Sequence, residues 1–314
     1  MEVGASVPQT ECESAVGIGM PRHSWSRVGA EKFFVREGPD YTSTKKKSPS
    51  ASSLYELCRL DWYRAGKKVG GVGELVELPK AEHANTAVPS LLVVNVQLPL
   101  EAPQVFKGAK LDGPTLHAVF YFTLKEDTAR ALEDLETASP SVRVLAEYFR
   151  RAESQPEVRS RFKALAFVNN LDKINMNRLI SPFNGKPVLI TESGSLVRGS
   201  RGAGGGATGG ALHSVPPVSA AENGGGGGGD AGGAGVGSRA SFGVDEYLEL
   251  DVNVRRWNFM ARKGLNKLTP KFGSMNVGVA FLVEGRTDAE LPEQILGCAT
   301  LNSLDIDRAQ MLEA

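Results

Sequence analysis

EYLELDVNV, residues 246–254, alternates apolar and polar side chains along its length. Successive side chains of a β-strand point to opposite faces, so Leu248 and Leu250 share one face and Glu249 and Asp251 share the other. We expect the leucine face to lie in the core and the carboxylate face to be exposed to water, as in the half-buried strands of antiparallel sheets.

Further runs rich in Val, Leu, Ile and Phe and bounded by turn residues predict strands; these are 91–97, 116–124, 164–169, 187–191, 276–284 and 296–302. Three helices are predicted, at 126–138, 140–153 and 255–268, the second with Ser139 as its cap and Pro140 in its first turn. Runs of strands with few helices and no regular βαβ alternation predict an α+β fold: a mostly antiparallel sheet with a few packed helices.

The stretch 199–241 contains 17 glycines in 43 residues. It has too little apolar surface to offset the entropy of ordering, so we expect a disordered Gly-rich insertion. Strands are predicted on both sides of it, which favours one domain over 25–305. Residues 1–24 are then a flexible N-terminal segment and 306–314 a C-terminal tail.

Charge and composition exclude several classes of function. Lys+Arg and Asp+Glu both total 36, so no global field favours nucleic acid, and no nucleic-acid partner is expected. Three scattered cysteines and four histidines show no metal-ligand spacing; we expect no metal and no cofactor, and interpret His117 as structural. Without a secretory signal or an apolar span, the expected location is cytoplasmic, with peripheral membrane association as an option.

Two local patterns suggest chemistry that their surroundings do not support. Gly70-Gly-Val-Gly73 lacks the G-K-[ST] of a phosphate-binding loop and is interpreted as a turn. Glu249 and Asp251, about 7 Å apart on one strand face, could act as paired carboxylates, but a solvated strand face is the simpler interpretation. An enzyme hypothesis stays open, with a polar site that would add Asn95 and Gln97 from the strand 91–97.

The segment 255–271 carries six positive charges and no acid. A basic amphipathic helix of this kind could lie on an anionic membrane or bind an acidic partner. Alternatively it packs its apolar stripe on the sheet and leaves its charges in water. The candidate binding residues are Arg255, Arg256, Trp257, Arg262, Lys263 and Lys267.

Short pieces along the chain resemble, in order, the C-terminal domain of the plant enhanced disease resistance protein two family. They are WS (25–26), FVR (34–36), KKK (45–47), LDW (60–62), NVQLP (95–99), RFK (161–163), KPVL (186–189), YLELDV (247–252), AFLVE (280–284) and LPEQILG (291–297). The resemblance covers about residues 25–305. The Gly-rich insertion and the basic character of the segment after Val254 depart from the plant pattern.

The resemblance implies regulatory, lipid-linked work at membranes. In plant members this domain often follows pleckstrin-homology and START-type domains, and we expect the present chain to work without them. Our leading hypothesis is therefore a non-enzymatic lipid- or protein-binding regulatory module, with anionic lipid or a protein as partner. The alternatives are the enzyme built around Glu249, Asp251, Asn95 and Gln97, and a protein–protein scaffold without a small ligand.

Overall fold

The structure is a computed structural model that describes residues 6–11, 20–104, 110–174, 184–189, 194–200, 213–215 and 241–313. Most of the predicted insertion, 201–212 and 216–240, lies outside the described residues.

The larger sheet has seven strands in the order β10-β9-β11-β5-β6-β4-β14. Its neighbours pair antiparallel except β11 with β5 and β14 with β4, which are parallel. The strands are β4 (Tyr55–Ala65), β5 (Leu91–Pro99), β6 (Thr115–Leu124), β9 (Gly194–Ser200), β10 (His213–Val215), β11 (Glu246–Asn253) and β14 (Gln310–Met311). Because β9 and β11 pair antiparallel, the two ends of the insertion lie close together.

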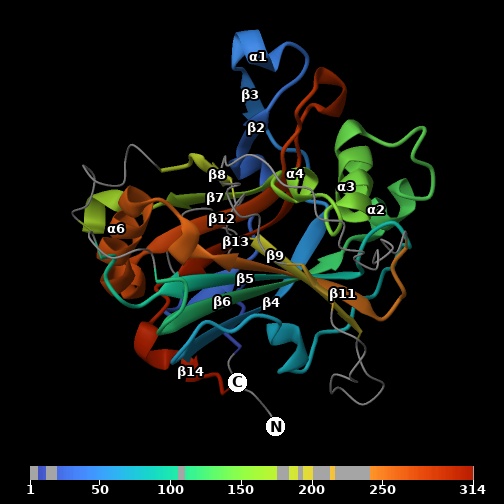
Figure 1. Cartoon of the computed structure of the whole chain (residues 1–314). Coiled ribbons are helices and arrows are strands. Elements are labelled where there is room, and N and C mark those ends of the chain that lie inside the picture. The colour runs from blue at the N-terminus through green and yellow to red at the C-terminus, as the bar shows by residue number, and fades with distance from the viewer. Residues whose placement is uncertain are drawn as a thin grey trace, which may run out of the picture.

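The smaller sheet has five antiparallel strands in the order β1-β13-β12-β7-β8. They are β1 (Ser24–Ser26), β7 (Phe162–Val168), β8 (Pro187–Leu189), β12 (Asn276–Val283) and β13 (Ile295–Asn302). A separate hairpin of β2 (Phe34–Arg36) and β3 (Lys47–Pro49), with α1 (Tyr41–Thr44) at its tip, projects from the body of the protein (Figure 1).

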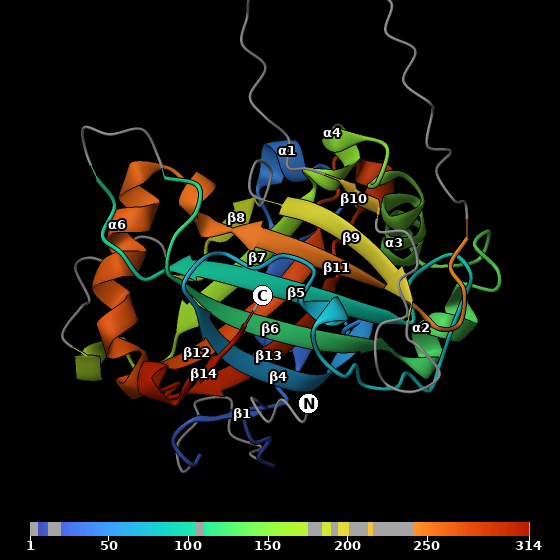
Figure 2. The ribbon, with the colours of Figure 1, turned by 60° about the horizontal axis from the view of Figure 1, so that its bottom comes forward.

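The two sheets pack face to face around one large apolar core (Figure 2). The ring of Phe281 on β12 lies 5.4 Å from that of Phe120 and 5.8 Å from that of Phe122, both on β6. Edge-on contacts of this kind are favoured by aromatic rings and add to the area that they bury. The predicted α+β fold with mostly antiparallel sheets is confirmed.

Helices stand at the two ends of the sandwich (Figure 1). At one end α3 (Pro140–Arg151) buries Tyr148 and Phe149, and Ser139 caps it as predicted by accepting a hydrogen bond from the Val142 N–H. At the other end Asn258 caps α6 (Phe259–Leu268). The remaining helices are short: α2 (Glu126–Ala131), α4 (Pro156–Arg159) and the 3₁₀ turns η1 (Ala30–Lys32), η2 (Val72–Glu74), η3 (Leu171–Ile174), η4 (Val254–Arg256), η5 (Thr269–Ser274), η6 (Asp288–Glu290) and η7 (Ile306–Arg308).

Both ends of the described chain lie along β4. The sequence had predicted a flexible segment at one end, residues 1–24, and a tail at the other, residues 306–314. The Val7 N–H donates to the Leu60 carbonyl at 2.8 Å, and the Trp25 indole donates to the Val7 carbonyl at 3.0 Å. At the other end β14 pairs with β4. The free N–H and C=O groups of an edge strand need partners, and these two segments supply them.

Candidate functional site

Four polar side chains of the predicted site come together on the outer face of the seven-stranded sheet. β11 and β5 are adjacent and parallel, with Asp251 opposite Asn95 and Asn253 opposite Gln97. Side chains alternate along both strands, so Glu249 and Asp251 project on the same side as the two amides. We call Asn95, Gln97, Glu249 and Asp251 the carboxylate cluster.

The amides of the carboxylate cluster donate hydrogen bonds to Asp251. Asn95 Nδ2 lies 2.6 Å and Gln97 Nε2 lies 3.1 Å from Asp251 Oδ1. The same two nitrogens donate to the Val69 carbonyl at 3.0 and 2.9 Å. All four side chains are buried, with Glu249 fully inaccessible. The prediction that the carboxylate face of this strand is exposed to water is therefore wrong, because the chain after β4 folds back over it.

Backbone N–H groups of the glycine-rich turn hold the two carboxylates from above. The Gly71 N–H donates to Asp251 Oδ2 at 3.2 Å, and the Val72 and Gly73 N–H groups donate to the two oxygens of Glu249 at 2.9 and 2.8 Å. Successive N–H groups in such a turn form an anion-binding concavity. Here the anion is a pair of side chains of the same protein.

The glycines of this turn are required by its close contacts. Gly71 has φ +66, a conformation that favours glycine. A Cβ at Gly70 would lie 2.7 Å from an Asp251 oxygen, and one at Gly73 would lie 2.6 Å from the Tyr247 ring. The sequence correctly predicts a turn, but not what it covers.

Described Lys and Arg side chains make no hydrogen bond or ion pair to these carboxylates. Burial raises the pKa of Asp251 well above its ordinary value, and the charge of Glu249 raises that pKa further. Asp251 thus keeps its proton to a higher pH than an exposed aspartate does.

His117 on β6 lies next to the carboxylate cluster. Its Nδ1 lies 3.0 Å from Asn95 Oδ1, and the side chain is fully buried. Burial, followed by the nearby charges of Arg255 and Lys68, lowers the pKa of His117 to about 4. The imidazole is therefore neutral at physiological pH, and its Nδ1–H donates to the amide oxygen of Asn95.

The enzyme hypothesis required these four side chains to converge in a concave pocket. They converge, but the glycine turn covers them, and the oxygens of both carboxylates accept hydrogen bonds from protein donors. A catalytic acid or base must reach the proton that it transfers. In this arrangement the carboxylate cluster fastens the turn to the sheet and presents no group to a substrate.

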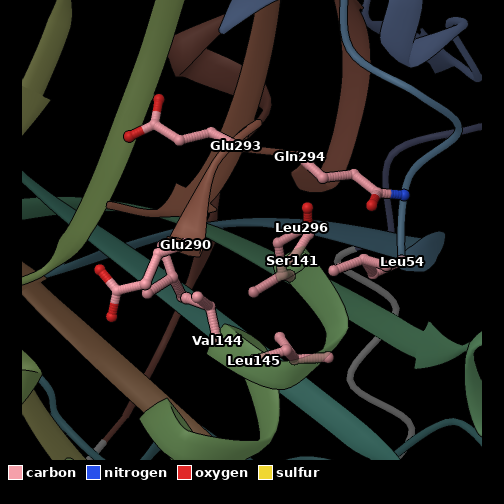
Figure 3. Close-up of a pocket in the computed structure, with 9 residues that line it drawn as sticks. Leu54, Ser141, Val144, Leu145, Glu290, Glu293, Gln294 and Leu296 are labelled. Carbon is pink, nitrogen blue, oxygen red and sulfur yellow. The ribbon is translucent and has the colours of Figure 1, made fainter. Parts of the chain in front are cut away.

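A small pocket does occur elsewhere, between α3 and β13. Leu54, Val144, Leu145 and Leu296 form its apolar lining, whereas the carboxylates of Glu290 and Glu293 point away from it (Figure 3). Its volume of about 10 Å³ is no more than one water molecule needs. This pocket is too small for an organic ligand.

A second polar cluster, not predicted from the sequence, lies where β2 meets the smaller sheet. Lys163 Nζ on β7 is 3.1 Å from Glu284 Oε1 and 3.0 Å from Glu293 Oε1. Arg36 Nη2 on β2 is 2.9 Å from Glu284 Oε1. We call Arg36, Lys163, Glu284 and Glu293 the ion-pair cluster; beside it Arg161 pairs with Glu290 at 2.9 Å.

The ion-pair cluster is formed by residues from four of the short pieces noted in the sequence: FVR, RFK, AFLVE and LPEQILG. Their order along the chain gave no sign that they would meet, because β2, β7, β12 and β13 become neighbours only through the fold. Burial alone would raise the pKa of Glu284, but Lys163 and Arg36 reverse the shift and lower it.

Arg255, the first of the predicted lipid-binding residues, is not exposed. Its side chain is 2% accessible, and its guanidinium lies 2.8 Å from Glu101 Oε2, 2.9 Å from Thr115 Oγ1 and 2.7 Å from the Pro114 carbonyl. Its assignment to a binding surface is corrected here, because it fastens η4 to the β5–β6 connection. The helix that was predicted from Arg255 begins only at Phe259, after the Asn258 cap.

The other predicted binding residues of this segment lie in two environments. Lys263 and Lys267 on α6 are exposed, together with Met260 at 69%. Arg256 and Arg262 are half-buried, as is Trp257, which packs against the main core. We call Met260, Lys263 and Lys267 the α6 face.

Two further findings concern the described part of the chain. It has no group of three or more His, Cys, Asp or Glu residues placed to hold a metal ion. None of its helices is long and apolar enough to cross a bilayer.

The comparison with known proteins gives a family. The family model "Protein ENHANCED DISEASE RESISTANCE 2, C-terminal" matches residues 25–305, so the chain belongs to that family, as its motifs predicted. No curated protein and no solved structure matches the chain.

Proposed function

We propose that this member of the ENHANCED DISEASE RESISTANCE 2 C-terminal family is a non-enzymatic regulatory module that binds anionic membrane surfaces through the α6 face. The observation that carries the proposal is an exposed methionine beside two exposed lysines, on a segment without acidic residues. Basic residues near an anionic bilayer attract it, and an apolar side chain between them can enter the headgroup region.

The helix has one side for the core and another for a partner. Leu265 packs against the main core and Leu268 against a smaller apolar cluster beside η3. Met260, Lys263 and Lys267 lie within about 60° of one another on the opposite side, at 100° per residue. A single apolar stripe could not serve both core and bilayer, but here Met260 is separate from the stripe that is packed.

The expected affinity is modest. Each basic residue near an anionic surface contributes about 1 kcal/mol before screening by salt. Two lysines and one methionine therefore give weak, reversible, salt-sensitive attachment, which suits peripheral association.

Sedimentation with liposomes tests the proposal. We expect the wild-type chain to pellet with vesicles that contain phosphatidylserine, more at low than at physiological salt, and not with neutral vesicles. The double variant Lys263→Gln/Lys267→Gln should bind about thirtyfold more weakly at low salt, since it loses two basic contacts of about 1 kcal/mol each. Both side chains are exposed, so the thermal midpoint should not change.

A variant with Lys45, Lys46 and Lys47 changed to Gln is the control. It removes three exposed positive charges, one more than the α6 double variant, but from the hairpin of β2 and β3 instead of from α6. It should retain binding. If this control loses as much vesicle binding as the α6 variant, net charge and not α6 drives the attachment. If the wild-type chain does not bind anionic vesicles, the membrane proposal is wrong and a protein is the partner to search for.

A further inference from the structure

A second basic and apolar surface lies beside α6, on two loops far apart in the sequence. Lys67 and Lys68 follow β4, and Lys110 and Leu111 precede β6; all four are exposed, Leu111 at 43%. We call these four residues the basic loop patch.

The two halves of the basic loop patch are joined by Asp112. Its Oδ1 accepts hydrogen bonds from the Lys68 N–H at 2.6 Å and from the Gly113 N–H at 2.7 Å. These bonds lower the pKa of Asp112, the one from Lys68 most. Asp112 is thus ionised, and it joins the two loops while offsetting part of the positive charge of the three lysines.

The patch is also fastened to the turn that leads into α6. Asn253 Nδ2 donates to the Leu111 carbonyl at 3.1 Å, and Arg255 reaches the Pro114 carbonyl and Glu101. The described parts of the β5–β6 connection, residues 100–104 and 110–114, run beside α6 in both views of the ribbon (Figure 1, Figure 2). The buried Arg255 therefore fixes the position of the basic loop patch relative to α6.

Their combined charge suits an anionic surface. The α6 face and the basic loop patch present five lysines against Asp112, whereas the whole chain has a formal charge of zero. Each also presents one exposed apolar side chain, Met260 or Leu111. Local charge of one sign next to isolated apolar side chains is the composition of an interfacial membrane contact.

We propose that the basic loop patch is a second contact of the same membrane-binding surface, so that the chain attaches to anionic lipid at two points rather than by α6 alone. This inference rests on the proposed function. Two linked weak contacts bind more tightly than either one, because the second forms at high effective concentration.

The test uses the full chain and vesicles of neutral lipid with or without about one-third phosphatidylserine. The variants are Lys67→Gln/Lys68→Gln/Lys110→Gln and, separately, Leu111→Ser, beside the α6 double variant and the Lys45–Lys47 control. We expect the triple variant to bind at least about tenfold more weakly and Leu111→Ser about threefold more weakly, with unchanged thermal midpoints.

The outcomes separate the two proposals. If the wild type binds and the α6 variant fails while the loop variants bind like wild type, only α6 touches the bilayer and this inference is wrong. If the loop variants fail and the α6 variant does not, only the loop surface touches the bilayer, and both the α6 contact and the two-point attachment are wrong. If all variants, including the Lys45–Lys47 control, lose vesicle binding equally, both the α6 contact and the loop contact are wrong.

Discussion

The two buried polar clusters stabilise carboxylates in opposite ways. In the carboxylate cluster, Glu249 and Asp251 are held by amides and backbone N–H groups, with no Lys or Arg hydrogen-bonded to them among the described residues. In the ion-pair cluster, Glu284 and Glu293 share Lys163 and Arg36. Neutral donors stabilise a buried charge only in part, whereas cations offset it directly.

The difference appears in the direction of the pKa shifts. The pKa of Asp251 is raised and that of Glu284 is lowered. A raised carboxyl pKa contributes stability at low pH, which is lost as pH rises toward the folded-state pKa. A lowered one contributes stability above the ordinary pKa of about 4, which is lost as pH falls below it. One chain thus holds two carboxylate sites with opposite pH dependence.

The largest effect should come from breaking the ion-pair cluster. Lys163→Met removes the cation shared by Glu284 and Glu293 and leaves Glu293, whose side chain is 3% accessible, with Arg36 at 3.8 Å. We expect the free energy of unfolding to fall by about 3 kcal/mol, measured by urea denaturation, because an uncompensated buried charge remains.

The double variant Lys163→Met/Glu293→Gln is the control. It removes one negative charge with the cation, so it should recover part of the lost stability. A loss below about 1 kcal/mol in the single variant would contradict the view that charge balance stabilises this cluster.

A smaller effect is expected from the turn over the carboxylate cluster. Gly73→Ala places a Cβ 2.6 Å from the Tyr247 ring and should lower the free energy of unfolding by about 2 kcal/mol, as overpacking does. Gly66→Ala, in the same connection but with no atom within 4 Å of the new Cβ, is the matched control and should change stability by less than about 1 kcal/mol. Equal effects would show that the turn is not tightly packed on the sheet.

The smallest expected effect is on the pH dependence of stability, in which the two clusters differ. Asp251→Asn removes the group whose raised pKa costs stability as pH rises above about 4. Relative to wild type, the variant should therefore become progressively more stable in urea unfolding as pH rises above the ordinary aspartate pKa of about 4. His117 remains in both proteins, so the difference reports on the carboxylate pair of Asp251 and Glu249, and parallel pH profiles would show that the pKa of Asp251 is not raised.

Strands and helix caps were predicted best where the signal is local. Ser139 and Pro140 predicted the start of α3, and the alternation of 246–254 predicted β11. β4 was missed because a register shift between Leu57 and Arg59 interrupts its alternation. The predicted helix 126–138 continues only to Ala131, and the start of α6 was misplaced although Asn258 offered a capping signal.

The sequence by itself determined the family, the α+β class, the alternation of β11 and the acid-free basic segment, because motifs, periodicity and charge are read from neighbouring residues. Only the tertiary structure decided which of these side chains meet water. Val72 and Glu249 are 177 positions apart and Arg255 and Glu101 are 154 apart, yet these contacts bury the carboxylate face and take Arg255 out of the exposed basic surface. Burial depends on partners brought from distant parts of the chain, and no local pattern records them.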